Sequence, residues 1–290
     1  MDLTVSVAIP VRLATATIES TLEAAIAQAR EVNGEVIAAV WRGDPSFKVV
    51  ESQAARHSGI LRVALAERQC GIPQLRRDAV RIARAPLVVI TEDHCLFPPG
   101  WLAGMIKRPG EVHGGGVGNG RDSYAGWAQY FTRYSAFMPP VPDELVQQLS
   151  GNNACYPASL LDSPSLDQGF WEAEFNRELV GRGVLFRMCS ALTIAQRQER
   201  GWLEYIPLRF RHGRSYGARR GGSKLGALLR APLVPAVLLW RILRAQLRKR
   251  YHLGWFVLTL PLLICYILAW SAGELSGSLA GVDDCSRDTD

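Results

Sequence analysis

Short apolar runs bounded by turn residues recur in the first third of the chain. Each run is five to eight residues long and rich in valine, isoleucine, leucine and alanine, at residues 3–10, 35–41, 60–65 and 87–91. Runs of this length and composition are typical of buried strands, and in a parallel sheet they read as continuous apolar stretches. The pattern therefore predicts four buried strands before residue 92.

Helical spacing fills two of the gaps between these runs. Residues 15–32 carry apolar side chains at three- and four-residue steps, with Thr17 as a candidate N-cap. Residues 73–84 form a second, arginine-rich helix. Strands that alternate with helices indicate right-handed crossovers and a largely parallel α/β sheet. No glycine-rich phosphate-binding turn follows the first strand, which argues against a dinucleotide-binding fold.

An acidic cluster follows the fourth run directly. Glu92, Asp93 and His94 come next, and Pro98-Pro99-Gly100 then turns the chain before a helical pattern opens at Trp101. In open α/β sheets, ligands gather in the crevice beyond the carboxyl ends of the strands. The cluster is therefore well placed to hold a divalent cation together with a phosphate-bearing substrate. The alternative is a solvated acidic turn that contains a histidine by chance.

The middle of the chain gives weaker signals. Residues 114–119 are too glycine-rich for an ordinary strand interior, and they indicate either a close backbone approach to a ligand or a flexible loop. Aromatic residues then repeat at three- and four-residue steps, at Trp127, Tyr130, Phe131, Tyr134 and Phe137. A stripe of this kind is more often a packed helix face than a sugar platform.

A second acidic segment lies in a predicted helix over residues 170–180. Glu172 falls near the helix start, and Glu174 and Glu178 are one turn apart on another face. A solvated acidic face is the alternative to a functional role. Residues 184–194 return as a strand, and the sequence from Arg209 onward is read as a basic linker.

Composition limits the class of protein. The 290 residues are 48% hydrophobic, enough for a sizeable core, and the formal charge is +6. Much of the positive charge lies between Arg209 and Arg250, so it does not indicate a nucleic-acid partner. The six cysteines include no C-x-x-C pair and are expected to be free, mostly buried thiols in a reducing compartment. The amino terminus has no basic segment before its apolar run, so no signal peptide is expected and the main domain should be cytoplasmic.

The carboxyl-terminal region predicts a membrane anchor. Residues 253–273 contain no charged side chain and have aromatic residues toward the ends. This stretch is long enough to cross a bilayer core of about 30 Å. A buried core helix is the alternative. Residues 231–240 are also uncharged but too few, and a second span would place the arginines of residues 241–250 outside, against the positive-inside rule. Residues 225–250 are therefore expected to form an interfacial helix on anionic headgroups. One span is predicted, with two as the alternative, and the tail with Asp283, Asp284, Asp288 and Asp290 would lie outside.

The order of the motifs resembles that of the family 2 glycosyltransferases, which have the GT-A fold. The matching segments are VSVAIP at 5–10, GIPQLRRDA at 71–79, EDHC at 92–95 with PGWL at 99–102, GGV at 115–117, GNNA at 151–154 and WEAE at 171–174 with Arg182-Gly183. The resemblance implies a mostly parallel sheet flanked by helices over residues 1–220. A basic interfacial segment at 221–252, a transmembrane helix at 253–273 and an acidic tail at 274–290 would follow.

Four departures from the family pattern are visible. Glu92 and His94 stand in the slot of the two aspartates of the D-x-D motif, and Glu172 replaces the usual aspartate of the base slot. The second strand ends without the aspartate pair that usually holds the nucleobase, and Asp44 is the candidate substitute. Ala195 or Gln196 replaces a downstream histidine. A catalytically inactive relative is the alternative that these departures leave open.

The resemblance also implies roles for particular residues. A divalent cation, Mn²⁺ or Mg²⁺, would bind Glu92 and His94, and Glu172 would be the catalytic base with Glu174 as second choice. The nucleotide-diphosphate sugar donor would contact Pro10, Arg12, Asp44, Arg76, Arg77 and Asp93. Asn153 and Trp171 would lie on the acceptor side.

The anchor points to a lipid or lipid-linked acceptor at the cytoplasmic face of the cell membrane, because tethering concentrates an enzyme near such an acceptor. The resemblance implies that transfer inverts the anomeric centre by direct displacement. Two other classes stay open: a non-catalytic membrane-tethered protein that binds nucleotide sugars or lipids, and a nucleotidyltransferase on a similar fold.

Overall fold

The computed structural model describes residues 2–198 and 200–281. By its internal contacts the chain divides into two compact units. The first unit comprises residues 1–120 and 139–197, and the second comprises residues 121–138 and 198–290. The α/β architecture predicted from the apolar runs lies in the first unit, whereas residues 121–138 and 198–220 group with the carboxyl-terminal helices.

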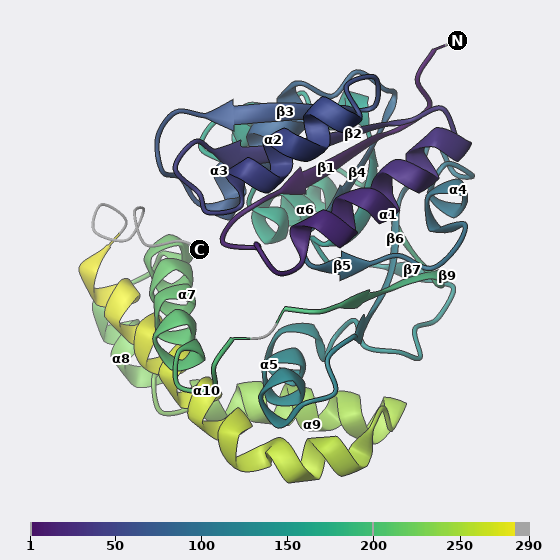
Figure 1. The fold of residues 1–290 in the computed structure, drawn as a ribbon. Helices are drawn as coiled ribbons and strands as arrows, with labels where there is room; N and C mark the ends of the chain where they lie inside the picture. Colours follow the sequence, from purple (N-terminus) through teal and green to yellow (C-terminus); the bar gives the residue numbers. More distant parts are fainter. Residues whose placement is uncertain (1, 199, 282–290) are drawn as a thin grey trace. The chain divides into compact units, whose positions relative to one another are not determined.

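One mixed sheet forms the centre of the first unit (Figure 1). Among the described residues it has nine strands in the order β3-β2-β1-β4-β8-β6-β9-β5, and β7 pairs with β9. The predicted strands are present as β1 (Ser6–Pro10), β2 (Glu35–Trp41), β3 (Leu61–Ala66) and β4 (Leu87–Thr91), all parallel to their neighbours in this group. The later strands are β5 (Cys95–Leu96), β6 (Val112–Asn119), β7 (Leu145–Val146), β8 (Asn153–Pro157) and β9 (Phe186–Gln196). β8 runs antiparallel to β4, so the second half of the sheet is mixed.

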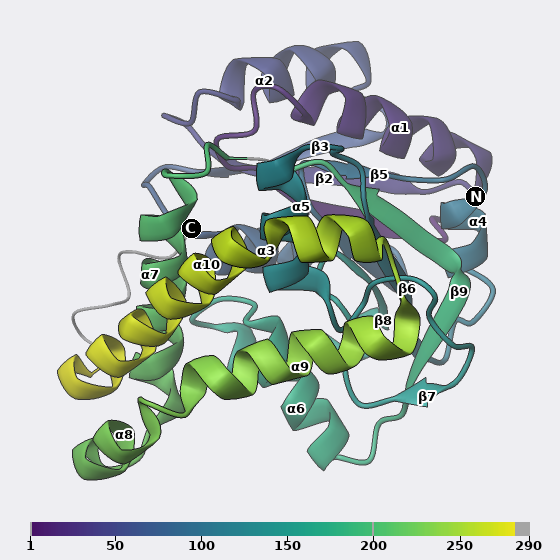
Figure 2. The same cartoon turned by 90° about the horizontal axis from the view of Figure 1, so that it is seen from below.

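Helices cover both faces of this sheet. α1 (Ile18–Glu31) and α2 (Phe47–Arg56) lie on one face, and α3 (Ile72–Arg81) lies on the other (Figure 2). Two further helices, α4 (Trp101–Met105) and α6 (Glu172–Gly181), and two short 3₁₀ turns, Ala158–Leu160 and Pro164–Leu166, complete the first unit. α2 was not expected from the sequence, because only Val50 and Gln53 of its ten residues are buried and its apolar pattern is short.

The register of the parallel strands brings their carboxyl ends to one edge. Ala8 of β1 lies opposite Ile90 of β4, and Pro10 lies opposite Ala39 of β2. The segments that leave β1, β2 and β4 therefore start side by side. This edge is where the sequence predicts the ligand-binding crevice.

The glycine-rich segment is a buried strand, β6, and not a flexible loop. A Cβ atom on Gly114 would lie 2.2 Å from the carbonyl oxygen of Asn153, and one on Gly115 would lie 2.1 Å from the carbonyl oxygen of Leu192. The close backbone approach considered from the sequence is therefore to neighbouring protein segments. Residues without side chains are needed here because β6 is packed between β8 and β9.

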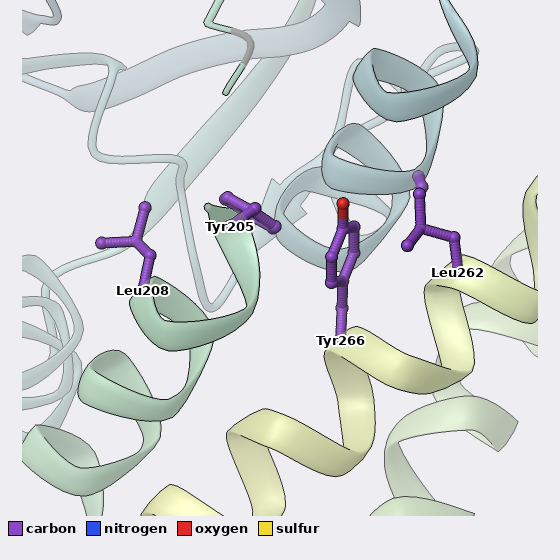
Figure 3. Packing of buried hydrophobic residues seen from close by; sticks show 5 residues of the cluster. Tyr205, Leu208, Leu262 and Tyr266 are labelled. Carbon is purple, nitrogen blue, oxygen red and sulfur yellow. The ribbon is translucent and has the colours of Figure 1, made fainter. Parts of the chain in front are cut away.

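The second unit is helical. It contains α5 (Tyr124–Tyr134), α7 (Tyr205–Arg220), α8 (Lys224–Arg230), α9 (Val234–Lys249) and α10 (Leu253–Ala280). The aromatic stripe lies on α5 as a packed helix face, as its spacing predicts, with Phe137 just beyond the helix. Tyr205 and Leu208 of α7 pack with Leu262 and Tyr266 of α10 and with Ala128 of α5 in a buried cluster (Figure 3).

The interpretation of the segment from Arg209 as a linker is wrong. It belongs to α7, whose buried face includes Tyr205, Leu208, Gly213 and Gly217. α7 also contains five arginines, so its buried face is not recognised from the spacing of large apolar residues.

α10 extends beyond the predicted span. It continues past Gly273 to Ala280 and so includes the first part of the predicted tail, whereas Asp283, Asp284, Asp288 and Asp290 lie outside the described residues. Among the described residues, α10 is the one helix long and apolar enough by itself to cross a membrane. α8 and α9 pass the same test only as a pair, and they are bent by 54° at their junction.

The described cysteines are free thiols, as predicted. Cys95, Cys155 and Cys189 are buried, Cys70 is half-buried and Cys265 is exposed. Cys285 lies outside the described residues.

Candidate active site

The loops after β1 and β2 meet at the carboxyl edge of the sheet. The backbone N–H of Arg12 donates to Oδ2 of Asp93 at 2.8 Å, which ties the β1 loop to the end of β4. The N–H of Leu13, a residue in the left-handed region with φ of 52°, donates to Asp44 with N–O distances of 3.0 and 3.2 Å. Pro10, Arg12, Asp44 and Asp93 are thus brought together, as the strand-end rule predicts.

The Asp44 carboxylate accepts hydrogen bonds from backbone N–H groups in this structure. Besides Leu13, its Oδ1 accepts from the N–H of Ser46 at 2.8 Å, and the side chain is buried. A carboxylate that accepts several N–H groups fixes the loop around it. Its predicted contact with a nucleobase stays a prediction, and the structure adds a role in shaping the loops after β1 and β2.

Glu92, Asp93 and His94 form a buried cluster at the end of β4. Their exposed fractions are 7%, 5% and 4%, so the alternative of a solvated acidic turn is wrong. The His94 ring lies between the two carboxylates, with Nδ1 2.8 Å from Oδ1 of Asp93 and Nε2 3.2 Å from Oε2 of Glu92. Burial lowers the pKa of His94, but its interactions with Asp93 and Glu92 outweigh this and raise the pKa above its usual value.

One guanidinium joins this cluster to the predicted base. Arg76 of α3 is buried, and its Nη2 lies 2.5 Å from Oε1 of Glu92. Its Nη1 donates to Oε2 of Glu172 at 2.8 Å. Segments 96 residues apart in the sequence therefore meet at Arg76. A planar guanidinium is suited to this task because it presents two N–H groups in a fixed geometry.

Arg77 lies elsewhere. Its Nε donates to Oδ1 of Asp78 at 2.8 Å, and its Nη1 donates to the carbonyl oxygen of Asp167 at 3.0 Å. Successive helix residues point about 100° apart, so one arginine of the pair faces the acidic cluster and the other does not. Of the two arginines predicted to meet the diphosphate, the structure brings only Arg76 to the centre.

Glu172 and Glu174 face different surroundings. Glu172 is the first residue of α6, and its side chain is 33% exposed beside Arg76. Glu174 is exposed to solvent. Two residues on a helix differ by about 200° in direction, which is why they cannot serve one pocket in the same way. The geometry favours Glu172 over Glu174 as the functional carboxylate.

Gly151 makes room for the Glu172 carboxylate. A Cβ atom at residue 151 would lie 1.4 Å from Oε2 of Glu172. Gly151 belongs to the turn before β8, and its part in the site was not assigned from the sequence. The GNNA motif was the available signal, but a motif alone does not tell which side chain the glycine admits.

Replacing Gly151 by alanine is expected to displace Glu172 without unfolding the protein. The clashing atoms belong to the end of a flexible side chain, which can rotate away at small cost, but the contact with Arg76 would then be lost. We expect Gly151→Ala to change the melting temperature by only a few degrees while lowering activity about as much as loss of Glu172 itself. Gly110→Ala is the control, since a Cβ there meets nothing within 4 Å. Full activity in Gly151→Ala would show that the Glu172 position is unimportant.

No family model matches the sequence, and no curated protein matches it. Solved structures do match the fold. The mannosyltransferase PcManGT from Pyrobaculum calidifontis, solved with GDP-Man and Mn²⁺, has a TM-score of 0.63 at 17% identity over 95% of this chain and 88% of that one. Residues 1–349 of TarS from S. aureus, solved with UDP-GlcNAc, give a TM-score of 0.52 at 16% identity over 72% and 65%. The chain has the GT-A fold.

Within this GT-A fold, the buried side chain of Asn153 forms hydrogen bonds to neighbouring protein segments. Its Nδ2 donates to the carbonyl oxygens of Gly116 and Leu192 at 2.9 and 2.7 Å, and its Oδ1 accepts from Nε1 of Trp101 at 3.0 Å. These three bonds leave the buried amide little capacity for an acceptor substrate. Trp171, the other predicted acceptor-side residue, is half-buried at the N-cap of α6 beside Glu172.

Gln196, one of the two residues that stand in place of the family's downstream histidine, also lies near the acidic cluster. Gln196 ends β9 and pairs with Cys95 of β5, and the N–H of Arg197 donates to the carbonyl oxygen of His94 at 2.8 Å. Gln196 is buried, and its Nε2 lies 3.3 Å from Oδ1 of Asn119. This segment therefore lies beside the acidic cluster, a neighbourhood that was not predicted from the sequence.

Proposed function

We propose that this chain is a glycosyltransferase that moves a sugar from a nucleoside diphosphate to a lipid or lipid-linked acceptor. The GT-A fold supports a nucleotide-sugar donor, as do the GDP-Man and UDP-GlcNAc bound in PcManGT and TarS. The observation that carries the proposal is the double contact of Arg76 with Glu92 and Glu172. This contact supports the proposal because the proposed base, Glu172, and the proposed diphosphate site at Glu92 share one guanidinium.

The residues at the end of β4 fit a divalent cation. Nε2 of His94 is buried and lies 3.2 Å from Oε2 of Glu92. Two ligand atoms at right angles and about 2.1 Å from one cation lie about 3 Å apart, so this pair matches one edge of a coordination sphere. No group of three or more protein ligands occurs among the described residues. Cations in nucleotide sites commonly take one or two protein ligands and complete their shell with phosphate oxygens and water.

Glu92 and His94 would hold this cation, and Mn²⁺ suits a carboxylate with an imidazole better than Mg²⁺ does. When bound, a divalent cation neutralises charge on the departing diphosphate. PcManGT was solved with Mn²⁺, which agrees with this choice.

The chain's own residues supply the rest of the chemistry. Glu172 accepts the proton of the attacking hydroxyl, a role for which its carboxylate is available because its side chain is partly exposed. Arg76 orients Glu172 and offers positive charge to the diphosphate, because a guanidinium binds phosphate oxygens as it binds carboxylates. Direct displacement by the hydroxyl inverts the anomeric centre.

The acceptor is proposed from the second unit. The apolar helix α10 and the basic helix α9 suit a membrane surface, where a lipid or lipid-linked acceptor is concentrated. We place the first unit on the cytoplasmic side. A protein that binds nucleotide sugars without turnover is the competing outcome, and the Glu172 experiment below distinguishes the two.

Substitutions at the proposed cation site test this assignment by binding alone. We expect Mn²⁺ together with a nucleoside diphosphate to raise the melting temperature of the parent protein, because a ligand that binds the native state stabilises it. Glu92→Ala and His94→Ala should each reduce this shift by weakening cation-dependent binding about tenfold or more, while binding without Mn²⁺ changes less. Asp78→Ala, on the far side of α3, is the control. Shifts equal to those of the parent in both variants would overturn the cation site.

A further inference from the structure

α7 and α10 pack against each other through glycines on both helices. A Cβ on Gly213 or Gly217 would lie 1.9 or 2.0 Å from the carbonyl oxygens of Trp270 or Glu274. A Cβ on Gly273 or Gly277 would meet the carbonyl oxygens of Phe210 or Arg214 at 2.0 or 1.9 Å. Higher residue numbers on α7 match higher numbers on α10, so the two helices run parallel at backbone contact. The carboxyl-terminal half of α10 therefore runs parallel to α7 and lies in the same environment as α7, whether hydrocarbon or water.

The charge of α7 determines what those surroundings can be. α7 carries five arginines, Arg209, Arg211, Arg214, Arg219 and Arg220. Glu274 of α10 is buried, and its Oε1 lies 2.6 Å from Nη1 of Arg220. Glycine pairs of this spacing also join helices inside membranes, but a helix with so many arginines is too costly in the hydrocarbon core. The part of α10 from Trp270 onward must therefore lie outside the hydrocarbon.

The rest of α10 is short for a helix that crosses a bilayer. Residues 253–269 rise about 25 Å at 1.5 Å per residue, less than a core of about 30 Å. This part is also covered on one side, since Phe256, Leu262 and Tyr266 are buried. Its exposed large apolar residues lie on one face at helical spacing, with exposed fractions from 37 to 68%: Leu253, Val257, Leu258, Ile264 and Leu268. One exposed apolar stripe is typical of a helix that lies along an interface.

α9 presents a second stripe of the same kind. Val237, Trp240 and Leu247 are exposed at steps of three and seven residues, which places them on one face. Arginines flank or interrupt this face at Arg241, Arg244 and Arg248. Apolar residues with an indole and guanidinium groups match the interface of an anionic leaflet, in which acyl chains lie below phosphates.

We infer that α9 and α10 lie along one leaflet of an anionic membrane and that α10 does not cross it. The chain is then held at the cytoplasmic surface by these two stripes and the basic residues of α9. The prediction of a single span at residues 253–273 used the apolar composition alone and did not include the pairing of α10 with α7. This inference goes beyond the proposed function, because it concerns attachment alone and holds whether or not the chain transfers sugars.

Flotation of the purified full chain with vesicles tests the partner. The parent protein should bind vesicles of phosphatidylcholine and phosphatidylglycerol about tenfold more tightly than vesicles of phosphatidylcholine alone. Val237→Glu combined with Leu247→Glu should weaken binding to the anionic vesicles about tenfold or more, since two apolar side chains lose their burial. Leu185→Glu is the matched control, because Leu185 is 66% exposed in the first unit. Equal binding by the double variant and the control, or no preference for the anionic vesicles, would overturn the proposed surface.

Labelling of Cys285 in intact cells tests the topology. In a Cys70→Ser, Cys265→Ser background, the other described cysteines are buried, so a membrane-impermeant maleimide reports on Cys285. Attachment to one leaflet predicts no labelling until the cells are permeabilised, as for a reference cysteine placed at Ser223 between α7 and α8. Labelling of Cys285 in intact cells, with the Ser223→Cys reference protected, would show that α10 crosses the membrane. Neither readout depends on turnover.

Discussion

Glu172→Gln is expected to leave nucleotide binding and the fold intact while turnover falls by about 10² to 10⁴-fold. The amide has nearly the shape of the carboxylate and still accepts a hydrogen bond from Arg76, but it cannot take a proton from the acceptor hydroxyl. Single-turnover measurements with saturating donor, beside thermal shifts with nucleoside diphosphate, separate chemistry from binding.

Glu174→Gln is the matched control for this experiment. Glu174 lies two residues along α6 and is exposed, so its replacement should change turnover by less than about threefold. Equal, small effects of both substitutions in a protein that still binds nucleotide would contradict the assignment of the base. They would indicate a nucleotide-sugar-binding protein with an acidic helix.

Arg76→Ala is expected to affect stability and activity together. The substitution leaves the buried Glu92 carboxylate without its guanidinium and releases Glu172. Removing one partner of a buried ion pair typically lowers the free energy of unfolding by about 3–5 kcal/mol. Turnover should fall by about 10² to 10³-fold at a temperature where the variant is folded, because a preorganised charge beside the reacting groups is lost.

Two comparisons identify the cause of that effect. Arg77→Ala removes the neighbouring arginine, which contacts Asp78 and Asp167, and should lower the free energy of unfolding by at most about 1 kcal/mol. Arg76→Lys keeps the charge but has one ammonium in place of a planar fork, so it should restore stability better than turnover. Urea unfolding and donor turnover measure the two properties. If Arg76→Lys restores both fully, the double contact with Glu92 and Glu172 is not required.

β1, β2 and β4 were predictable because nearly all of their residues are buried, whereas β3 is buried only at Leu61 and Ala64. Every residue of β1 and β4 is buried, so both strands appear in the sequence as mostly apolar runs. β2 was predicted with the bounds that the structure gives, Glu35–Trp41. The edge at which Arg12 and Asp93 meet also followed, because parallel strands place their carboxyl ends together.

Elements that depend on packing between distant segments were not predictable in the same way. β6 contains Gly114 and Gly115 because neighbouring backbone lies where side chains would be, and glycine in a strand reads locally as a loop. α7 is buried through Gly213 and Gly217, which carry no hydrophobic signal. In both cases the partner that explains the residue is far away in the sequence.

The same limit applies to the site. The sequence offered Arg76 and Arg77 equally for the diphosphate, and Glu172 before Glu174 only by resemblance. The choice between them needs the direction in which each side chain leaves its helix, which depends on how α3 and α6 pack. Gly151 is explained only by the atom it admits, Oε2 of Glu172.

Release of nucleoside diphosphate tests the central proposal most directly. Purified full chain, given a panel of UDP-, GDP- and dTDP-sugars with lipid extract and Mn²⁺, should release the diphosphate from at least one donor and label a lipid product with its sugar. The release should depend on the divalent cation and fall in Glu172→Gln by about 10² to 10⁴-fold. No release and no nucleotide-dependent rise in melting temperature with any donor of the panel would contradict the proposed transfer.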